Sequence, residues 1–136
     1  MTVVPAAFRD LIAEESCAIA YLATTQPDGS PILSPVWFGP DGDDHLLIVT
    51  YADSLKARNM HARPQVAIVL QDPEDTYRYL QVRGHVIESH LDPARAKALM
   101  QQFSWRYLGK AYPFEIGDDI IFRIKIEHAN GLHITH

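Results

Sequence analysis

The spacing of apolar residues predicts a chain built mainly from short strands. Apolar side chains dominate residues 17–25, 31–38 and 45–50. The stretches between them, residues 26–29 and 39–43, are rich in Pro, Asp and Gly and therefore predict turns. Strands joined by such short turns pair antiparallel, so two adjacent hairpins are expected in the first half of the chain.

The second half predicts further strands and one long helix. Residues 65–71 and 77–88 are strand-like, and residues 120–127 alternate apolar with polar side chains, which is typical of a strand with one buried face. Residues 92–109 indicate a helix, because Asp-Pro suits its N-cap and first turn and Gly suits its end.

Two shorter helices complete the pattern. One is expected near residues 5–12, and another begins at Asp53 or Ser54 and ends before Pro64. Six strands without a repeated strand–helix–strand rhythm favour a small antiparallel barrel over a doubly wound sheet. No linker divides the sequence, so residues 1–136 are expected to form a single, mainly β domain with peripheral helices.

Composition and charge exclude several classes of protein. The chain has 47% hydrophobic and 21% charged residues, which is ordinary for a globular protein and excludes a disordered chain. A net charge of −5 argues against a nucleic-acid binder. The longest apolar runs fall short of the roughly 18 residues that span a bilayer. With one cysteine and no disulfide, we expect a cytoplasmic protein without a nucleic-acid or membrane partner.

The segment that follows the third predicted strand has chemistry suited to a phosphate. Residues 51–65 carry a surplus of two positive charges in an acidic chain. A helix that starts at Ser54 presents unpaired N–H groups, to which the hydroxyls of Thr50 and Ser54 and the ammonium of Lys56 add further donors. The alternative is a capped surface helix with solvated charges.

Two other segments are open to two interpretations. In residues 34–38 the alternation fails, so this strand is either buried on both faces or lies against a flat ligand. Gln81 and Arg83 share one strand face with Tyr79, either as a polar outer surface or as ligand contacts across a subunit boundary. Cys17 lies in an apolar run, which predicts a buried thiol. The seven histidines lack metal-ligand spacing, so no metal site is expected.

Four motifs occur in order between Ala18 and Glu88. They are Leu-Ala-Thr-Thr-x-Pro-Asp-Gly-x-Pro at residues 22–31, Pro-Val-Trp-Phe at 35–38, Thr-x3-Ser-x-Lys-x2-Asn at 50–59 and Tyr-x-Gln-Val-Arg-Gly at 79–84. Together they resemble the split-barrel flavin and deazaflavin oxidoreductases, the superfamily that includes pyridoxamine 5′-phosphate oxidase. The resemblance implies a homodimer of six-stranded antiparallel split β-barrels, with two cofactor sites at the interface.

The resemblance also assigns cofactor-binding roles. Thr50, Ser54 and Lys56 would hold the cofactor phosphate, with Asn59 nearby. The residues that would line the ring system are Ser34, Pro35, Val36, Trp37 and Val49. Gln81 would contact the ring or its tail from the other subunit.

Departures from the vitamin B6 oxidases indicate which branch of the superfamily the chain resembles. Those oxidases carry an arginine where Leu55 stands, and they have a C-terminal substrate-binding segment for which this chain is too short. Ser-x-Lys-x-x-Asn with Pro-Val-Trp-Phe is more similar to the branch that uses the 8-hydroxy-5-deazaflavin coenzyme F420.

We therefore expect an F420-dependent reductase that transfers a hydride between the deazaflavin and a conjugated small-molecule substrate. Two alternatives remain: an FMN-binding oxidoreductase like pyridoxamine 5′-phosphate oxidase, and a non-enzymatic carrier of a cofactor or tetrapyrrole. No catalytic residue is assigned. Tyr51, Tyr79, Tyr112 and solvent are the candidate proton donors.

Overall fold

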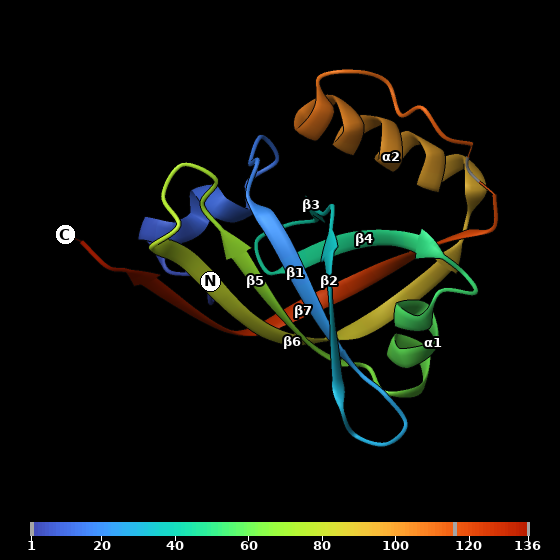
Figure 1. Cartoon of the computed structure of the whole chain (residues 1–136), viewed down its shortest axis with the longest axis horizontal. Helices are drawn as coiled ribbons and strands as arrows, with labels where there is room; N and C mark the ends of the chain where they lie inside the picture. Colours follow the sequence, from blue (N-terminus) through green and yellow to red (C-terminus); the bar gives the residue numbers. More distant parts are fainter. Residues whose placement is uncertain (1, 116, 136) are drawn as a thin grey trace.

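Seven strands form one antiparallel sheet in the order β2-β1-β5-β6-β7-β4-β3. The computed structural model describes residues 2–115 and 117–135 (Figure 1). The strands are β1 (Ile19–Thr25), β2 (Pro31–Val36), β3 (Gly39–Pro40), β4 (His45–Tyr51), β5 (Gln65–Gln71), β6 (Arg78–Leu91) and β7 (Asp119–His133). The helices are the 3₁₀ helix η1 (Ala6–Ile12), α1 (Leu55–Ala62) and α2 (Pro93–Leu108). The predicted mainly β class with peripheral helices is confirmed.

The expected strand at residues 31–38 is divided into two. β2 pairs with β1, whereas Gly39 and Pro40 of β3 pair with Leu47 and Leu46 of β4, at the opposite edge of the sheet. The segment 37–38 therefore passes from one edge of the sheet to the other. The sheet has β2 and β3 as its ends, so the structure has seven strands in an open order, and the six-stranded barrel is not confirmed.

The pairing of β6 with β7 is the longest in the sheet. It runs from Arg78 opposite His133 to Leu91 opposite Ile120, and both strands extend beyond their predicted ends. The register shifts between Arg83 and Gly84, where the glycine in residues 77–88 marks a β-bulge. A Cβ at Gly84 would collide with the backbone carbonyl of Lys125, so the close approach of the two strands requires glycine.

The core lies on the inner face of the curved sheet. Alternate residues of β1, β5 and the first half of β6 are buried there, as the period of two requires. Residues 46–48 of β4 and 119–122 of β7 are buried at consecutive positions, so these segments are covered on both faces. The largest fully buried side chains include Phe38, Leu22, Ile48, Ile68, Leu80 and Phe122. Each such side chain contributes about 1.5–3 kcal/mol through burial.

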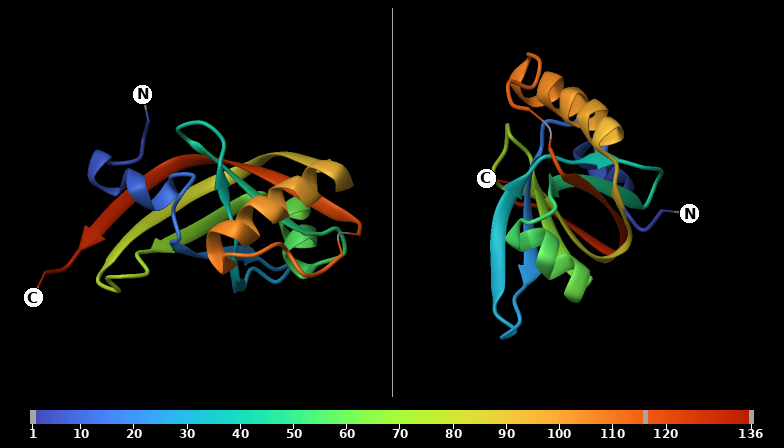
Figure 2. Two further views of the ribbon diagram at one scale, coloured as in Figure 1. Left: turned by 90° about the horizontal axis from the view of Figure 1, so that it is seen from above. Right: turned by 90° about the vertical axis from the view of Figure 1, so that its right-hand side faces the viewer.

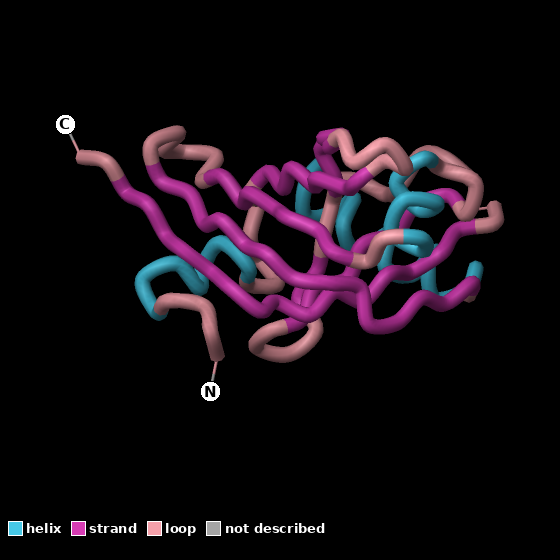
Figure 3. The backbone as a smooth tube through the Cα atoms, turned by 90° about the horizontal axis from the view of Figure 1, so that it is seen from below, coloured by secondary structure: helices cyan, strands magenta, loops and turns pink. Residues whose placement is uncertain are grey.

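The helix ends follow the predicted capping residues. The Ser54 hydroxyl accepts a hydrogen bond from the Ala57 N–H (3.1 Å), and the Asp92 carboxylate accepts one from the Arg95 N–H (3.1 Å). Gly109 ends α2 with a left-handed φ of 68°. Both α-helices lie at one end of the elongated sheet, while η1 and the C-terminus lie at the other (Figures 2 and 3). No described helix is long and apolar enough to cross a membrane.

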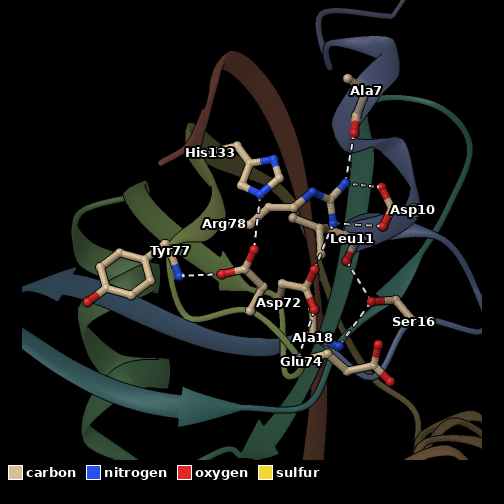
Figure 4. Close-up of polar contacts among 11 residues, drawn as sticks. Ala7, Asp10, Leu11, Ser16, Ala18, Asp72, Glu74, Tyr77, Arg78 and His133 are labelled. Carbon is tan, nitrogen blue, oxygen red and sulfur yellow. Dashed lines mark hydrogen bonds and ion pairs between the residues drawn. The ribbon is translucent and has the colours of Figure 1, made fainter. Parts of the chain in front are cut away.

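A polar cluster fastens η1 to the sheet (Figure 4). The guanidinium of Arg78 contacts the Asp10 carboxylate at 2.6 Å and the Asp72 carboxylate at 3.0 Å. It also donates to the Ala7 carbonyl and lies 5.2 Å from the centre of the Phe8 ring. The hydrogen bond from Arg78 lowers the pKa of the Asp10 carboxyl. These charges are paired within the fold, so we assign this end of the molecule a structural role.

We predict that Gly84→Ala lowers the free energy of unfolding by about 2–3 kcal/mol, because the added methyl group must separate β6 from β7. Urea denaturation measures the change. Gly117→Ala is the matched control, since a Cβ there meets no atom within 4 Å. Equal stability of the two variants would contradict the close-packed bulge.

Candidate cofactor site

A set of hydrogen-bond donors gathers where β4 ends and α1 begins. The Thr50 hydroxyl donates to the Ser54 hydroxyl at 3.0 Å, and Ser54 caps α1 through the Ala57 N–H. The first two helical N–H groups, those of Leu55 and Lys56, have no partner among the described residues. These N–H groups, the two hydroxyls and the half-buried Lys56 form what we call the helix cradle. Such a combination suits an anion.

Asn59 lies on the inner side of the same helix. Its amide donates to the Thr24 hydroxyl (3.1 Å) and accepts from the Arg63 guanidinium (3.1 Å), and the side chain is 1% exposed. Arg63 in turn donates to the Thr25 carbonyl at 2.7 Å. Asn59 therefore fastens α1 to β1. A direct contact with a phosphate would require it to exchange these bonds, and its place near the phosphate stays a prediction.

A second, apolar feature lies between the end of β2 and helix α2. We call this groove, which has a volume of about 440 Å³, the aromatic groove. It is lined by Ile19, Pro35, Val36, Trp37, Met100, Tyr107, Tyr112 and Phe114. Three of the residues predicted to line a cofactor ring system, Pro35, Val36 and Trp37, thus form one wall of a groove of drug-like size.

The rings of this groove support one another. Trp37 stacks on Tyr107 with ring centres 5.6 Å apart and an angle of 5° between their planes. Tyr112 meets Trp37 edge-on at 5.9 Å and Phe114 edge-on at 5.5 Å. Offset stacked and edge-on pairs are the favourable aromatic geometries, so these ring contacts order the wall.

Arg106 holds this wall against segment 37–38, which passes from one edge of the sheet to the other. Its guanidinium lies 4.7 Å from the Tyr107 ring centre and 5.1 Å from that of Phe38, and it donates to the Phe38 and Glu14 carbonyls. Because Phe38 follows Trp37 in the chain, these contacts fix the segment that carries Trp37 to helix α2. The Arg106 Nε is buried and has no hydrogen-bond partner among the described residues.

Burial controls the acidity of the two groove tyrosines. It raises the pKa of Tyr107 to about 12, and the Tyr107 hydroxyl donates to the Ala18 carbonyl at 2.8 Å. Burial also raises the pKa of Tyr112, with smaller contributions from Tyr51 and Asp119. Tyr51 and Asp119 pair at the end of β4, next to Thr50.

The remaining predicted residues are placed differently. Val49 is half-buried and packs with the small cluster of Leu47 and Ile121 beneath α2. Ser34 pairs with Leu22 in the β1–β2 hairpin and does not line the groove.

Gln81 lies on the outer face of the sheet, in one cross-strand row with Val69, Tyr21 and the groove residue Pro35. There it lines a shallow hollow of about 460 Å³ together with Tyr21, Leu33, Val69 and Tyr79. Gln81 does not line the aromatic groove.

Sequence reasoning missed the wall that α2 and its following loop provide. Met100 and Tyr107 fall on the apolar stripe of α2, which predicts core packing, yet both line the groove. Phe114 is 67% exposed in a loop, and the run Tyr-Pro-Phe at 112–114 was the available signal. Cys17 is exposed and its thiol donates to the Arg106 carbonyl, so the expectation of a buried thiol was wrong. Among the described residues, no group of three or more potential metal ligands converges.

Comparisons with known proteins place the chain in a family. The family described as pyridoxamine 5′-phosphate oxidase matches residues 4–133, and the chain belongs to it. A solved structure named F420 reductase is 31% identical, with a TM-score of 0.81 over 93% of this chain and 98% of that one. The resemblance to the split-barrel superfamily, and within it to the F420-reductase branch, is confirmed.

More distant structures share the fold alone. A conserved hypothetical protein from Mycobacterium tuberculosis is 23% identical, with a TM-score of 0.75 over 99% of this chain and 91% of that one. General Stress Protein 26 from Bacillus anthracis is 18% identical, with a TM-score of 0.67 over 92% of this chain and 93% of that one. A search of curated protein sequences found no match.

We predict that Tyr107 makes stability fall at alkaline pH. Because its pKa is raised from an ordinary value near 10 to about 12 in the folded chain, its contribution is intact below pH 10 and is lost as the pH rises towards 12. The loss amounts to about 2 kcal/mol. Urea denaturation across this range should show a smaller decline for Tyr107→Phe than for the unmodified chain. Tyr51→Phe is the control, at a 56% exposed position, and its free energy of unfolding should fall as much as that of the unmodified chain. An equally large fall in Tyr107→Phe would contradict the assignment of the alkaline loss of stability to Tyr107.

Proposed function

We propose that the protein is an oxidoreductase that binds the deazaflavin F420 and reduces a conjugated small-molecule substrate. The observation that carries the proposal is that the chain has both a helix cradle, at the start of α1, and an aromatic groove, at α2. Thr50, Ser54 and Lys56 supply donors for a phosphate, and Pro35–Trp37 supply an apolar wall for a ring.

The cradle fits a phosphate on its own chemistry. The N–H groups of Leu55 and Lys56 have no partner among the described residues, and Lys56 makes no ion pair there. A phosphate placed at this helix end would give these donors partners and would meet the positive end of the helix dipole. Asp53 is exposed at the start of the turn, so it does not occupy the cradle with a buried negative charge.

When bound and reduced, the deazaflavin supplies the hydride, and the chain supplies binding, orientation and a water-poor surface. Lys56 and the hydroxyls hold the phosphate end, while Trp37 limits where the ring lies. Reduction of one substrate double bond consumes the hydride and one proton. Of the three candidate tyrosines, Tyr112 alone lines the aromatic groove, so we assign it ahead of Tyr51 and Tyr79 as the protein group that delivers this proton.

Similarity supports F420 over FMN. The solved structure named F420 reductase is 31% identical over nearly the whole chain, and Leu55 replaces the arginine of the vitamin B6 oxidases. FMN is the second candidate, since the matched family is described as pyridoxamine 5′-phosphate oxidase. A carrier without turnover would use the same pocket; it would bind the cofactor yet reduce no quinone or enone. We place the enzyme in the cytoplasm, in keeping with its single cysteine.

We predict that Lys56→Ala weakens F420 binding about 10- to 100-fold, because one charge-assisted hydrogen bond to the phosphate is lost. Titration of cofactor-free protein with F420 and with FMN, followed by calorimetry, measures the affinities. Arg58→Ala is the control, since Arg58 lies on the same helix, is exposed and carries the same charge.

Three results bear on this proposal. Tight F420 binding that Lys56→Ala weakens and Arg58→Ala preserves supports it. Tight FMN binding without F420 binding would mean that the cofactor is FMN and not F420. Unchanged affinity in Lys56→Ala would refute the cradle as the phosphate site.

We further propose that two copies pair through the outer face of the sheet. Leu33 is 71% exposed and Tyr21 36% exposed there, and both line the hollow that holds Gln81. An exposed apolar surface of this kind on a sheet is typical of an interface. Pairing would bring Gln81 of one protomer to the cofactor site of the other, which a single chain does not do.

We predict that Leu33→Asp converts a dimer into a monomer and weakens cofactor binding, because a charge is placed in the apolar contact. Sedimentation velocity measures the oligomeric state. Leu91→Asp is the matched control, at a 60% exposed leucine outside the hollow. A monomeric unmodified chain would contradict the proposed pairing.

A further inference from the structure

A hollow of about 450 Å³ lies on the outer face of the sheet, next to the one that holds Gln81. The two hollows share Ala23 and Ala67 as lining residues. One cross-strand row runs through both, and it consists of Leu33, Ala23, Ala67, Arg83 and His128. Because the two alanine side chains end at Cβ, they leave room for another molecule beside Arg83. We call this space the Arg83 hollow.

Arg83 differs from the other arginines that lie on strands, because it has no anion beside it. The guanidinium of Arg78 contacts the Asp10 carboxylate at 2.6 Å, and that of Arg123 contacts the Asp41 carboxylate at 2.7 Å. The exposed side chain of Arg83 makes no hydrogen bond or ion pair with any described residue. The cation in the Arg83 hollow is therefore available to an anion from another molecule.

The lining of the two hollows does not supply that anion. Among the described residues, Glu127 is the one acidic side chain that lines either hollow, and its carboxylate contacts the His85 Nδ1 at 2.8 Å. The hydrogen bond with His85 lowers the pKa of the Glu127 carboxyl, so this carboxylate is ionised and already has a partner. A second copy that pairs through the same face would present the same Glu127, engaged in the same way.

Pairing of two copies would make an unpartnered Arg83 costly. The proposed contact through Leu33 and Tyr21 lies beside the Arg83 hollow and would remove water from it. A guanidinium that loses water without gaining an anion weakens such a contact. Gln81 and Arg83 are two residues apart on β6, so they share the outer face, and a pairing that carries Gln81 to the partner's cofactor site carries Arg83 in the same direction.

We propose that Arg83 of one protomer supplies a second cation to the phosphate-bearing end of the cofactor held by the helix cradle of the other. The inference rests on the proposed function and on the proposed pairing, and it adds that each cofactor site is incomplete in a single chain. Lys56 is the one cation of the cradle itself. Arg83 would add the planar pair of N–H donors that binds a phosphate in two places, which a lysine does not offer.

Titration of the cofactor-free dimer with F420 tests the role of Arg83. Arg83→Ala should weaken F420 binding about 10-fold or more, because a charge-assisted contact with the phosphate is lost. Arg95→Ala is the matched control: Arg95 is an exposed arginine on α2, lines neither hollow and should leave the affinity unchanged. Arg83→Lys, which keeps the charge and loses the paired donors, should bind with intermediate affinity. If the unmodified chain binds FMN instead, FMN replaces F420 in each titration.

A mixed dimer shows from which chain Arg83 acts. Lys56→Ala and Arg83→Ala chains with different affinity tags are co-expressed, and purification on both tags in succession isolates the dimer that holds one of each. We expect one of its two sites to bind F420 as tightly as the unmodified protein, because that site combines Lys56 of one chain with the intact Arg83 of the other. Each parent dimer should have weakened sites only.

The outcomes separate this inference from the proposed function. Two weakened sites in the mixed dimer would mean that Arg83 acts within its own chain, and would overturn the inference. Unchanged F420 affinity in Arg83→Ala would overturn it and leave the proposed function intact. A monomeric unmodified chain that binds F420 would overturn both the pairing and the role of Arg83. Binding of neither F420 nor FMN by the unmodified chain would overturn the proposed function, and the assignment of Arg83 with it.

Discussion

The close pairing of β6 with β7 is the constraint on which the rest of the structure depends. The two strands run side by side from Arg78 to Leu91, and at Gly84 they approach so closely that no side chain fits. β6 carries β5 on its other edge, and β7 carries β4. A slip in this register would move the end of β4, where the helix cradle begins. It would also exchange the buried and exposed faces of each strand.

The same pairing fixes the aromatic groove. Helix α2 and the loop after it form the connection from the end of β6 to the start of β7, and Leu91 pairs with Ile120 across its base. The groove wall is therefore anchored at both ends. Arg106 adds a third anchor, because its contacts with Phe38 and Tyr107 tie α2 to the crossing segment that carries Trp37. An arginine used in this way is structural, and we propose Lys56 as the cation that the same chain supplies to the cofactor site.

Local chemistry in the sequence predicted the elements well. Ser54, Asp92 and Gly109 fixed the helix ends through their own hydrogen bonds and φ angle, so no tertiary information was needed. The outer ends of β6 and β7 were missed, because their exposed residues lose the alternation that marks a half-buried strand. β3 was missed because Gly39 and Pro40 have turn chemistry, and only their distant partner β4 makes them a strand.

The part of the candidate site that lies on one continuous segment could be predicted from the sequence. The part formed by several distant segments could not. Thr50, Ser54 and Lys56 lie within seven residues, so their convergence follows from one strand and one helix. The groove joins β1, the end of β2, α2 and a loop, and the sequence cannot show that Met100 faces Trp37 across it. Asn59 shows that a motif position alone can mislead. Its position suggested a ligand contact, whereas the fold gives its amide two internal partners.

A crystal structure of the protein with bound F420 tests the central claim most directly. The account predicts the phosphate at the N-terminus of α1, within hydrogen-bond distance of Ser54 and Lys56, and the deazaflavin ring against Pro35–Trp37. It also predicts that the face of the ring opposite this wall is open to the space lined by Tyr112 and Phe114. A phosphate bound elsewhere, with the helix cradle filled only by water, would contradict the account.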